Sequence, residues 1–357
     1  MIDIRDYGWD DFFEKEWNSF SGESIFPGRI TADYGQKFRV ISEFGELTVN
    51  RPVNRHGDEI QYAVGDWVVL ESPDAARQVK IRSVMARKSK FSRFASGIEV
   101  KEQIVAANID IVFLMQSLNR DFNVRRLERY LIAAWGSGAA PVVILSKADL
   151  CDNPAEKTAA VYAAAPGVEV HAVSCVTGEG IEDIKKYFSR GKTVALLGSS
   201  GVGKSTLVNT LAGSRVLKTG EIREGDGRGK HTTTHREILL LPGGGLILDT
   251  PGMRELAIWE ADTGMEVVFA DIEELAKRCR FRNCRHQSEP GCAVKEALEN
   301  GNLAKEKWES WLKLKKEQEY LEKRKETGFI LQQKKKGKQM AKFKKGFKSR
   351  FNAKERE

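Results

Sequence analysis

Short apolar runs alternate along the middle of the chain with longer stretches in which apolar residues recur every three to four positions. The runs are typical of buried strands and the stretches of amphipathic helices. One helix is expected from Val124 to Ala134, and another begins after Asn153, a capping residue followed by Pro154 at the first helical position. Strands that alternate with helices predict a parallel sheet covered on both faces. The expected strands are 109–115, 141–145, 170–173 and 193–197, followed by a hairpin of 238–241 and 246–248.

Residues 25–85 follow a different pattern. Five short strand-like runs are separated by Gly, Asn, Asp and Pro turns, which predicts a small β-barrel of the oligonucleotide-binding (OB) type. The loop 50–63 carries Arg51, Arg55 and His56, which either contact RNA or are merely solvated loop charges. Residues 1–24 are acidic and aromatic, and we expect them to form a short helix that packs on a neighbour.

A glycine-rich segment, 198–205, stands between the apolar run 193–197 and the expected start of a helix. Strand, glycine-rich loop and helix in this order predict a phosphate-binding P-loop, in which backbone N–H groups and the helix N-terminus face a phosphate. In such a loop Lys204 reaches the β- and γ-phosphates and the Ser205 hydroxyl ligates Mg²⁺. The predicted nucleotide-binding residues here are Gly198, Ser199, Ser200, Gly201, Val202, Gly203, Lys204, Ser205 and Thr206.

Further pieces of a nucleotide site follow other apolar runs. Asp149 can accept both hydrogen bonds that the N1 and N2 donors of guanine offer, a pair that adenine lacks, and an unpaired buried carboxylate would penalise the wrong base. Asp249 can hold Mg²⁺ through water, and Gly252 can offer its backbone N–H to a γ-phosphate. Ser174 and Cys175 can supply a backbone contact to the guanine O6, and one threonine of 232–234, assigned to Thr233, can close over Mg²⁺ and the γ-phosphate together. The remaining predicted residues are Ser146 and Lys147 beside Asp149.

These pieces occur in an unusual order. In ordinary GTPases the P-loop comes first and the guanine motif near the end, whereas here the guanine motif 146–149 precedes the P-loop and the motif 249–252 comes last. The order indicates a circular permutation, which is feasible because the termini of a domain often lie close together. The polar, glycine-dotted segment 214–236 is expected to be a switch loop that folds when a ligand holds it.

Four potential metal ligands lie close together near the C-terminal end. Three thiolates and one imidazole would make a closed tetrahedral Zn²⁺ site with no open position for chemistry. The alternative is a set of buried cysteines with a surface histidine. Arginines between the ligands, Arg280, Arg282 and Arg285, are candidates for phosphate contacts. The predicted zinc ligands are Cys279, Cys284, His286 and Cys292.

The positive charge is concentrated in a tail. The chain of 357 residues has a net charge of +8, and nine basic residues with no acid fall between Leu331 and Arg350, so the remainder sums to −1. Such a tail favours a polyanion as partner. Before it, residues 306–325 are expected to form a charged helix. The start of the chain lacks the pattern of a signal peptide and no run is long enough to span a membrane, so we expect a cytoplasmic protein without a membrane partner.

The barrel pattern, the permuted GTPase motifs with Lys230 to Thr234, and the cysteine–histidine spacing together resemble the RsgA (YjeQ) family of small-ribosomal-subunit-dependent GTPases. The resemblance covers about residues 25 to 300. It implies a monomeric enzyme that hydrolyses GTP to GDP and phosphate, binds the small ribosomal subunit and its rRNA, and acts late in the maturation of that subunit. Intrinsic hydrolysis is implied to be slow and to be stimulated by the subunit.

Two positions depart from what related GTPases have. The guanine motif begins with Ser146, where the family usually has Asn; the hydroxyl can still brace neighbouring loops, and the lost amide contacts are worth about 0.5–1.5 kcal/mol. Met253 stands where many GTPases hold a glutamine that orients water, which methionine cannot do. The resemblance implies His231 as the replacement, so the catalytic residues implied are His231, Lys204 and Gly252.

Two other functions compete with this one. The chain could be an RNA-binding scaffold in which nucleotide only orders the switch loop and turnover is incidental. It could also be a permuted GTPase of large-subunit assembly, although those generally lack both the barrel and the zinc module. The fold class expected is multidomain, with a barrel, an α/β P-loop GTPase and a zinc-binding helical module. The expected borders are 1–24 (N-terminal extension), 25–85 (barrel), 86–102 (basic linker), 103–262 (GTPase), 263–326 (zinc-binding helical domain) and 327–357 (basic tail).

Overall fold

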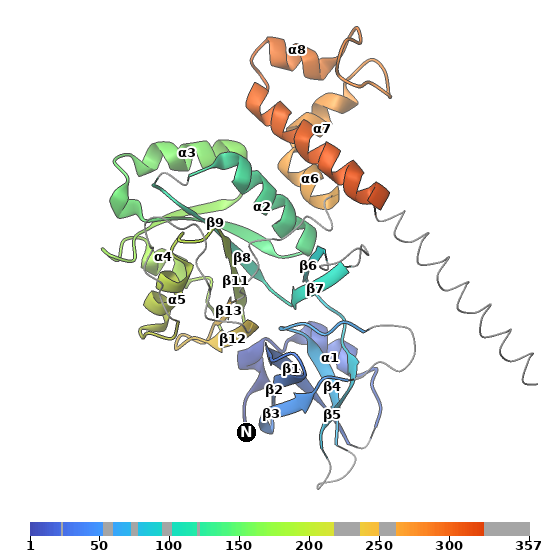
Figure 1. Cartoon of the computed structure of the whole chain (residues 1–357), viewed down its shortest axis with the longest axis vertical. Helices are drawn as coiled ribbons and strands as arrows, with labels where there is room; N and C mark the ends of the chain where they lie inside the picture. The colour runs from blue at the N-terminus through green and yellow to red at the C-terminus, as the bar shows by residue number, and fades with distance from the viewer. Residues whose placement is uncertain are drawn as a thin grey trace, which may run out of the picture. The chain divides into compact units, whose positions relative to one another are not determined.

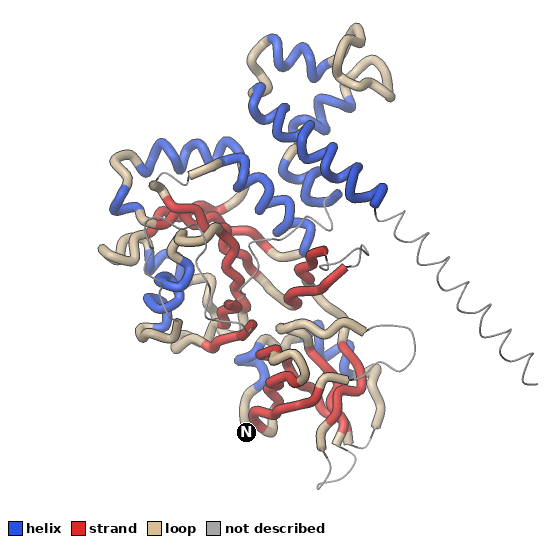
Figure 2. Tube along the Cα trace, viewed as in Figure 1, coloured by secondary structure: helices blue, strands red, loops and turns tan. Residues whose placement is uncertain are grey.

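The computed structural model describes residues 1–22, 24–52, 60–72, 78–94, 102–119, 122–217, 236–249 and 262–324. The chain divides into two compact units, Met1–Arg93 with Gln103–Ala270, and Phe94–Glu102 with Asp271–Glu357. Figures 1 and 2 show the helices and strands of each unit. None of the helices among the described residues combines the length and the apolar character that a membrane span requires.

Five parallel strands form the centre of the nucleotide-binding part. In sheet order they are β10 (Glu169–Val173), β9 (Ala140–Ser146), β8 (Ile111–Ser117), β11 (Thr193–Gly198) and β13 (Leu246–Asp249). Ser117 pairs with Ser146, and Ser146 pairs with Val173, so neighbouring strands end at nearly the same level. The carboxyl ends of all five strands therefore meet along one edge of the sheet, where ligands of such sheets bind.

Helices cover both faces of this sheet, as the sequence predicts (Figure 1). One face carries α2 (Val124–Ser137), α3 (Pro154–Ala164) and α6 (Asp262–Val268), which packs on α2. Residues of α4 (Ile181–Lys185) and α5 (Lys204–Ala212) complete an apolar cluster on the other face. The expected cap of α3 is confirmed, since the Asn153 side chain accepts a hydrogen bond from the Glu156 N–H at 3.2 Å.

Five antiparallel strands precede this part, which confirms the five runs expected within 25–85. They are β1 (Ile25–Asp33), β2 (Lys37–Ser42), β3 (Gly45–Asn50), β4 (Trp67–Glu71) and β5 (Lys80–Val84). Their pairing order is β3-β2-β1-β4-β5, and the two end strands, β3 and β5, also approach each other. Burial alternates with exposure along β3, as expected for a strand with one face towards a core.

The two sets of strands join into one hydrogen-bonded sheet. Strand β12 (Arg236–Leu240) runs antiparallel to β13 in the expected hairpin, and its other edge pairs with the end of β1, where Ala32 lies opposite Glu237. An ion pair between Arg39 and Glu237 reinforces this contact. The sheet is therefore mixed rather than purely parallel, and β12 is the strand through which the β1–β5 part meets the nucleotide-binding part.

The first residues pack on this β1–β5 part, as expected. They form a 3-10 helix, η1 (Ile4–Tyr7), and a short helix, α1 (Asp11–Trp17). Trp9 and Phe13 are buried against Trp67 of β4, with ring centroids 4.9 Å and 5.7 Å away. Burial of three large aromatic side chains is a substantial hydrophobic gain for so short a segment.

Part of the expected linker 86–102 is regular structure. Residues Lys90–Phe94 form strand β6, which pairs with β7 (Glu102–Ala107) in a separate two-stranded sheet. The apolar residues Phe91 and Phe94 stand three positions apart among the charges of this range, so no strand-like alternation marks β6 in the sequence. The domain borders themselves remain predictions.

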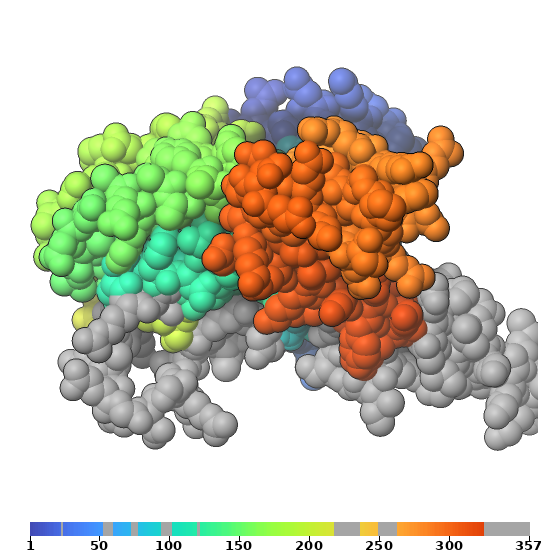
Figure 3. Space-filling view, turned by 90° about the horizontal axis from the view of Figure 1, so that it is seen from above, coloured from blue at the N-terminus to red at the C-terminus, as the bar shows by residue number. Residues whose placement is uncertain are grey.

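The second unit is helical. It contains α7 (Ala270–Lys277), α8 (Ala293–Glu299) and a helix over 305–324, close to the range expected for a charged helix. These segments, orange to red in Figure 3, form one continuous body. The buried apolar side chains of this unit include Ile272, Val294, Leu303, Trp308 and Trp311. The expected basic tail 327–357 lies outside the described residues.

Candidate functional site

The P-loop connects the end of β11 to the start of α5, as the sequence predicts. Gly201 and Gly203 have φ values of +74° and +100°, in the left-handed region that side chains disfavour. A Cβ at Gly198 would lie 2.5 Å from the Met115 carbonyl oxygen, so only glycine fits against β8 there. The loop therefore has the backbone shape in which N–H groups face a phosphate at a helix N-terminus.

The Lys204 ammonium lies over this loop. It donates hydrogen bonds to the carbonyl oxygens of Gly198 and Ser199, at 2.7 Å and 2.6 Å. These contacts hold the cation against the two residues that begin the loop. Ser205, next in sequence, occupies the first turn of α5 and is partly buried.

The guanine motif lies at the same edge of the sheet, directly after β9. Asp149 falls in the 3-10 helix η2 (Ala148–Leu150), and its Oδ1 accepts a hydrogen bond from the Ser174 hydroxyl at 2.6 Å. The Ser174 oxygen in turn accepts from the N–H groups of Val176 and Thr177, both at 3.2 Å. Ser174 thus orients the Asp149 carboxylate by its side chain, whereas the sequence had predicted only a backbone contact to the base.

The next residue, Cys175, is half-buried, and this burial raises the pKa of its thiol, with a hydrogen bond from Thr210 offsetting part of the rise. A thiol whose pKa lies above its ordinary value of about 8.5 is neutral at pH 7. Any role of Cys175 beside a nucleotide therefore falls to its backbone and its shape rather than to a thiolate.

Two residues link the guanine motif to the P-loop. The Ser146 hydroxyl lies 2.6 Å from the Val202 carbonyl oxygen and 3.3 Å from that of Gln116. Lys147 adopts φ of +58°, and its ammonium donates to the Gly201 carbonyl at 2.8 Å. Serine at 146 therefore still braces the neighbouring loop, although it has no amide group with which to make further contacts.

One polar residue near the site is absent from the prediction. Gln116 is fully buried near the end of β8, where its amide donates to the Asn123 carbonyl and accepts from the Asn123 N–H, at 2.9 Å and 2.8 Å. Asn123 is the N-cap of α2. Gln116 thereby fixes the turn between β8 and α2 beside the P-loop. A polar residue at the end of an apolar run is the signal that would have revealed it.

For four of the predicted site residues, the side chains are not among those that the structure describes. Residues His231, Thr233 and Gly252 lie outside the described residues. Asp249 is the last residue of β13, which is parallel to β11 and pairs with it through Leu248 and Ala195. The backbone therefore places Asp249 at the edge of the sheet from which the P-loop emerges.

A separate cluster in the second unit brings the four predicted zinc ligands together. The ligand atoms of Cys279, Cys284, His286 and Cys292 all lie within 4.8 Å of one another. The His286 Nδ1 is 3.5 Å from the Cys279 sulfur and 3.4 Å from the Cys292 sulfur, and these two sulfurs are 3.9 Å apart. A tetrahedral zinc with Zn–S bonds of about 2.3 Å separates two sulfur ligands by about 3.8 Å, so the cluster has the dimensions of such a site.

The surroundings of this cluster hold the histidine in place. The imidazole of His286 packs edge-on against Trp308, with centroids 5.7 Å apart, and Trp308 stacks on Trp311 at 4.8 Å.

Three arginines between the ligands are exposed, as expected of phosphate contacts: Arg280, Arg282 and Arg285.

The carboxylate of Glu289 caps the ligand-bearing loop. It accepts hydrogen bonds from the N–H groups of Arg285, Gln287 and Ser288 at 2.8 to 3.1 Å, and these bonds lower the pKa of Glu289 to about 2. The pKa of Glu289 in the folded protein lies below its ordinary value of about 4.3, so the ionised carboxylate stabilises the fold. This contribution is complete above that value and is lost as the pH falls towards 2. The sequence prediction did not include this residue.

Glu289→Gln is therefore expected to weaken zinc retention at neutral pH. Loss of a carboxylate that orders the loop between two ligands should speed zinc release to a chelator about tenfold. The matched control is Glu299→Gln at the end of α8, where the carboxylate forms an exposed ion pair with Lys295. Equal release rates for the two variants would show that Glu289 has no influence on the site.

Comparison with known proteins agrees with these observations. The family model described as RsgA GTPase matches residues 84–259. A protein of Listeria innocua named small ribosomal subunit biogenesis GTPase RsgA 1 is 44% identical over 320 residues, which covers 88% of this chain and 89% of the relative. The chain belongs to the RsgA GTPase family. It is accordingly a GTPase, as the sequence predicts.

Other relatives point the same way. An RsgA 2 protein of Vibrio parahaemolyticus is 42% identical, over 88% of this chain and 86% of that protein. The crystal structure of YjeQ from Thermotoga maritima superposes with a TM-score of 0.60 at 26% identity, covering 81% of this chain and 97% of that one. A model described as ABC transporter also matches residues 181–350, a range that, like the RsgA match, contains the P-loop.

The circular permutation also has a counterpart among solved structures. The structure titled YloQ, a circularly permuted GTPase, has a TM-score of 0.58 at 23% identity and covers 85% of this chain, which shows a shared fold. In this RsgA-family chain the permuted order places β9 and β10, with the guanine motif, before β11 and the P-loop.

Proposed function

We propose that this GTPase binds the small ribosomal subunit and acts late in its maturation, and that the subunit stimulates GTP hydrolysis. The observation that carries the proposal is the meeting of the guanine motif and the P-loop at one sheet edge, through the bonds of Ser146 and Lys147, in the permuted order of the RsgA family. The relatives' names state small-subunit biogenesis. We infer further that the protein works as a monomer in the cytoplasm, where its partners are GTP or GDP, the small subunit and rRNA.

In the nucleotide site, Asp149 is assigned to the guanine N1 and N2 donors, with Ser174 orienting it and Cys175 close to O6. Lys204 is assigned to the β- and γ-phosphates, together with the P-loop backbone. Mg²⁺ would be held by Ser205, Thr233 and Asp249, and it would supply charge neutralisation at the phosphates. The Gly252 N–H is assigned to the γ-phosphate, where a donor stabilises the negative charge on the phosphoryl group that is transferred to water, with GDP as the leaving group.

The β1–β5 part and the second unit are proposed to contact RNA. Strands β1 to β5, in the order β3-β2-β1-β4-β5 with β3 near β5, support an OB-type barrel. The Cys₃His cluster supports a structural zinc site that holds the exposed arginines of the second unit in place.

Replacement of His231 by alanine should remove most of the stimulated turnover and leave GTP binding unchanged. Met253 cannot orient a water molecule, and His231 lies next to the threonines assigned to the γ-phosphate end of the site. A side chain that orients or activates the attacking water typically contributes a factor of about 10² to 10⁴ to the rate of hydrolysis. Single-turnover hydrolysis with and without small subunits measures the effect, and stimulation equal to that of the parent would remove His231 from the mechanism.

Deletion of the chain after Gly328 is expected to weaken RNA binding in a salt-dependent way. The part of the tail between Leu331 and Arg350 carries nine basic residues and no acid. Each phosphate neutralised on single-stranded RNA contributes about −0.7 to the log–log slope of affinity against salt. If about six of these charges engage, the slope should flatten by about four units. Intrinsic hydrolysis should not change, and an unaltered slope would show that the tail is not an RNA contact.

The proposed binding is tested by sedimentation of the full chain with purified small subunits. With a non-hydrolysable GTP analogue the protein should pellet with the small subunit, and less of it should pellet with GDP. Large subunits serve as the control. Equal pelleting with both subunits, or none with the small one, would contradict the proposal.

A further inference from the structure

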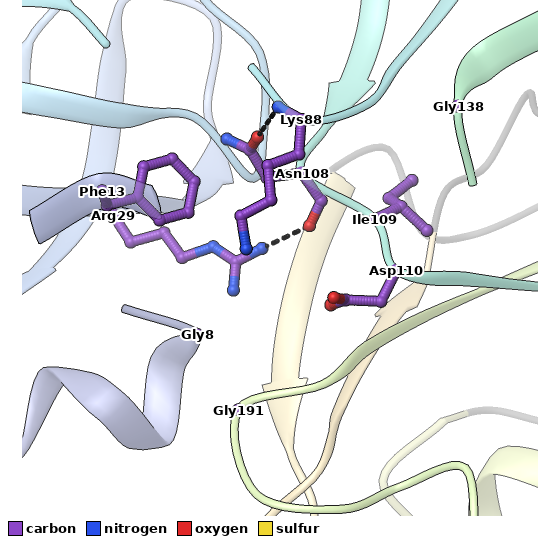
Figure 4. A pocket seen from close by; sticks show the side chains of 9 residues that line it. All are labelled: Gly8, Phe13, Arg29, Lys88, Asn108, Ile109, Asp110, Gly138 and Gly191. Carbon is purple, nitrogen blue, oxygen red and sulfur yellow. Dashed lines mark hydrogen bonds between the residues drawn. The ribbon is translucent and has the colours of Figure 1, made fainter. Parts of the chain in front are cut away.

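A buried arginine joins three parts of the first unit. Arg29 in β1 is 1% exposed, and its guanidinium donates to three backbone carbonyls. The acceptors are Tyr7 in the N-terminal segment, Gly65 before β4 at 3.3 Å, and Asn108 before β8 at 2.9 Å. Figure 4 shows the bond to Asn108 together with the neighbouring side chains.

The guanidinium makes no salt bridge with a carboxylate among the described residues. Burial lowers the pKa of Arg29 to about 10, and Asp110 and Asp66 act on it only from a distance. Burying a cation is costly unless hydrogen bonds compensate it, and an apolar side chain in this place would avoid the cost. The three carbonyl bonds are therefore the specific contribution of an arginine here.

The Asn108 position links this junction to the nucleotide site. Asn108 has φ of +54°, and its side chain accepts from the Lys88 N–H at 2.9 Å and donates to the Gly65 carbonyl at 3.0 Å. Strand β8 begins three residues later and runs to Ser117, past the buried Gln116 beside the P-loop. A shift of Asn108 is thus a shift at the base of a strand that ends at the site.

The N-terminal segment makes the same connection from outside. Its Gly8 crosses Gly191, which lies just before β11, so closely that a Cβ on Gly191 would be 2.6 Å from the Arg5 carbonyl oxygen. Arg190 forms ion pairs with Asp3 and Asp6. With Trp9 and Phe13 packed on Trp67, the segment contacts both the β1–β5 part and the nucleotide-binding part.

We propose that Arg29 is a positioning residue that holds the β1–β5 part, the N-terminal segment and the base of β8 together, so that RNA bound to the β1–β5 part acts on the nucleotide site. This coupling rests on the proposed function. Loss of the three carbonyl bonds would leave each part folded. The β1–β5 part could then move without moving the base of β8.

Two variants of the full chain test the coupling. Arg29→Met keeps the unbranched side chain as far as the position of Nε and removes the groups that donate to the carbonyls, and a polar cavity of about 160 Å³ beside Arg29 gives room for adjustment. Gly191→Ala leaves Arg29 intact and drives the N-terminal segment from its contact. In both variants intrinsic turnover and the KM for GTP should stay within about twofold of the parent, while turnover stimulated by small subunits falls about tenfold.

Hydrogen exchange gives a reading that does not depend on the ribosome. Amides of residues 1–20 and 108–117 should exchange about tenfold faster in both variants, whereas those of β9 and β10 should not change. The matched controls are Arg82→Met, which loses a single surface bond to the Ser21 carbonyl, and Gly167→Ala, at φ of +81° with nothing within 4 Å of a Cβ.

Unaltered exchange in 1–20 and 108–117, or full stimulation in both variants, would overturn the coupling. Faster exchange together with reduced stimulation supports it. If the parent protein itself is not stimulated by small subunits, the proposed function fails, and the exchange of 108–117 alone then decides whether Arg29 connects the two parts.

Discussion

Replacing Asp149 by asparagine is expected to change the preferred nucleotide from GTP to xanthosine triphosphate. The substitution turns one acceptor oxygen into a donor, so that N1–H and N2–H₂ of guanine lose an acceptor while the O2 of xanthine gains a donor. Because a bound base covers the side chain at position 149, and a covered polar group without a partner is costly, the ratio of the two affinities should shift by about three orders of magnitude. Competition against a fluorescent nucleotide measures this ratio, and an unchanged ratio would refute the assignment of the base.

Ser174→Ala is the matched control for that experiment. It removes the hydroxyl that lies 2.6 Å from the Asp149 carboxylate and keeps both acceptor oxygens. Affinity for GTP should fall by about 1 kcal/mol, with the preference for GTP retained. A change of preference in this variant would mean that Ser174, rather than Asp149 alone, reads the base.

Replacing Cys284 by alanine is expected to unfold the second unit and to leave nucleotide binding intact. Cys284 is partly exposed, so the loss of packing is small and the effect reports the metal site. Zinc in small structural modules contributes about 10–16 kcal/mol of apparent folding free energy at neutral pH. The variant should lose its one equivalent of zinc and the exchange protection of α8 and the helix 305–324, while GTP affinity stays that of the parent.

The control is Cys151→Ala, which changes a partly exposed cysteine of the nucleotide-binding part outside the metal cluster. It should keep full zinc content and full protection of α8. Parent protein that contains no zinc when purified without chelators, or a Cys284 variant with normal protection in the second unit, would contradict the structural role of the metal.

Local signals explain how much of this fold the sequence predicts. The P-loop depends on residues that are neighbours along the chain, and the cap Asn153 bonds to Glu156 only three positions away. The zinc ligands fall within fourteen positions, so their spacing alone brings them close together. Short strand-like runs between turn residues were sufficient for the five strands of the β1–β5 part, and short apolar runs were sufficient for the parallel strands after them.

The rest depends on contacts between residues far apart in the sequence. The pairing of β1 with β12 places Ala32 opposite Glu237. The Asp149 carboxylate, after β9, bonds to the Ser174 hydroxyl, after the neighbouring strand β10. Arg29 appears in the sequence as one more basic residue of a strand, and only the fold reveals that it is buried among three carbonyls. No periodicity or spacing encodes these contacts, since each arises from the packing of whole elements.

Stimulation by the small subunit is measured by multiple-turnover GTP hydrolysis with the parent protein alone and with purified small subunits. Turnover should be slow with the protein alone and at least about tenfold faster with small subunits, with large subunits giving no increase and Lys204→Ala abolishing the stimulated rate. The same rate with and without small subunits would contradict this stimulation and would leave an RNA-binding protein whose nucleotide serves only to order its switch loop.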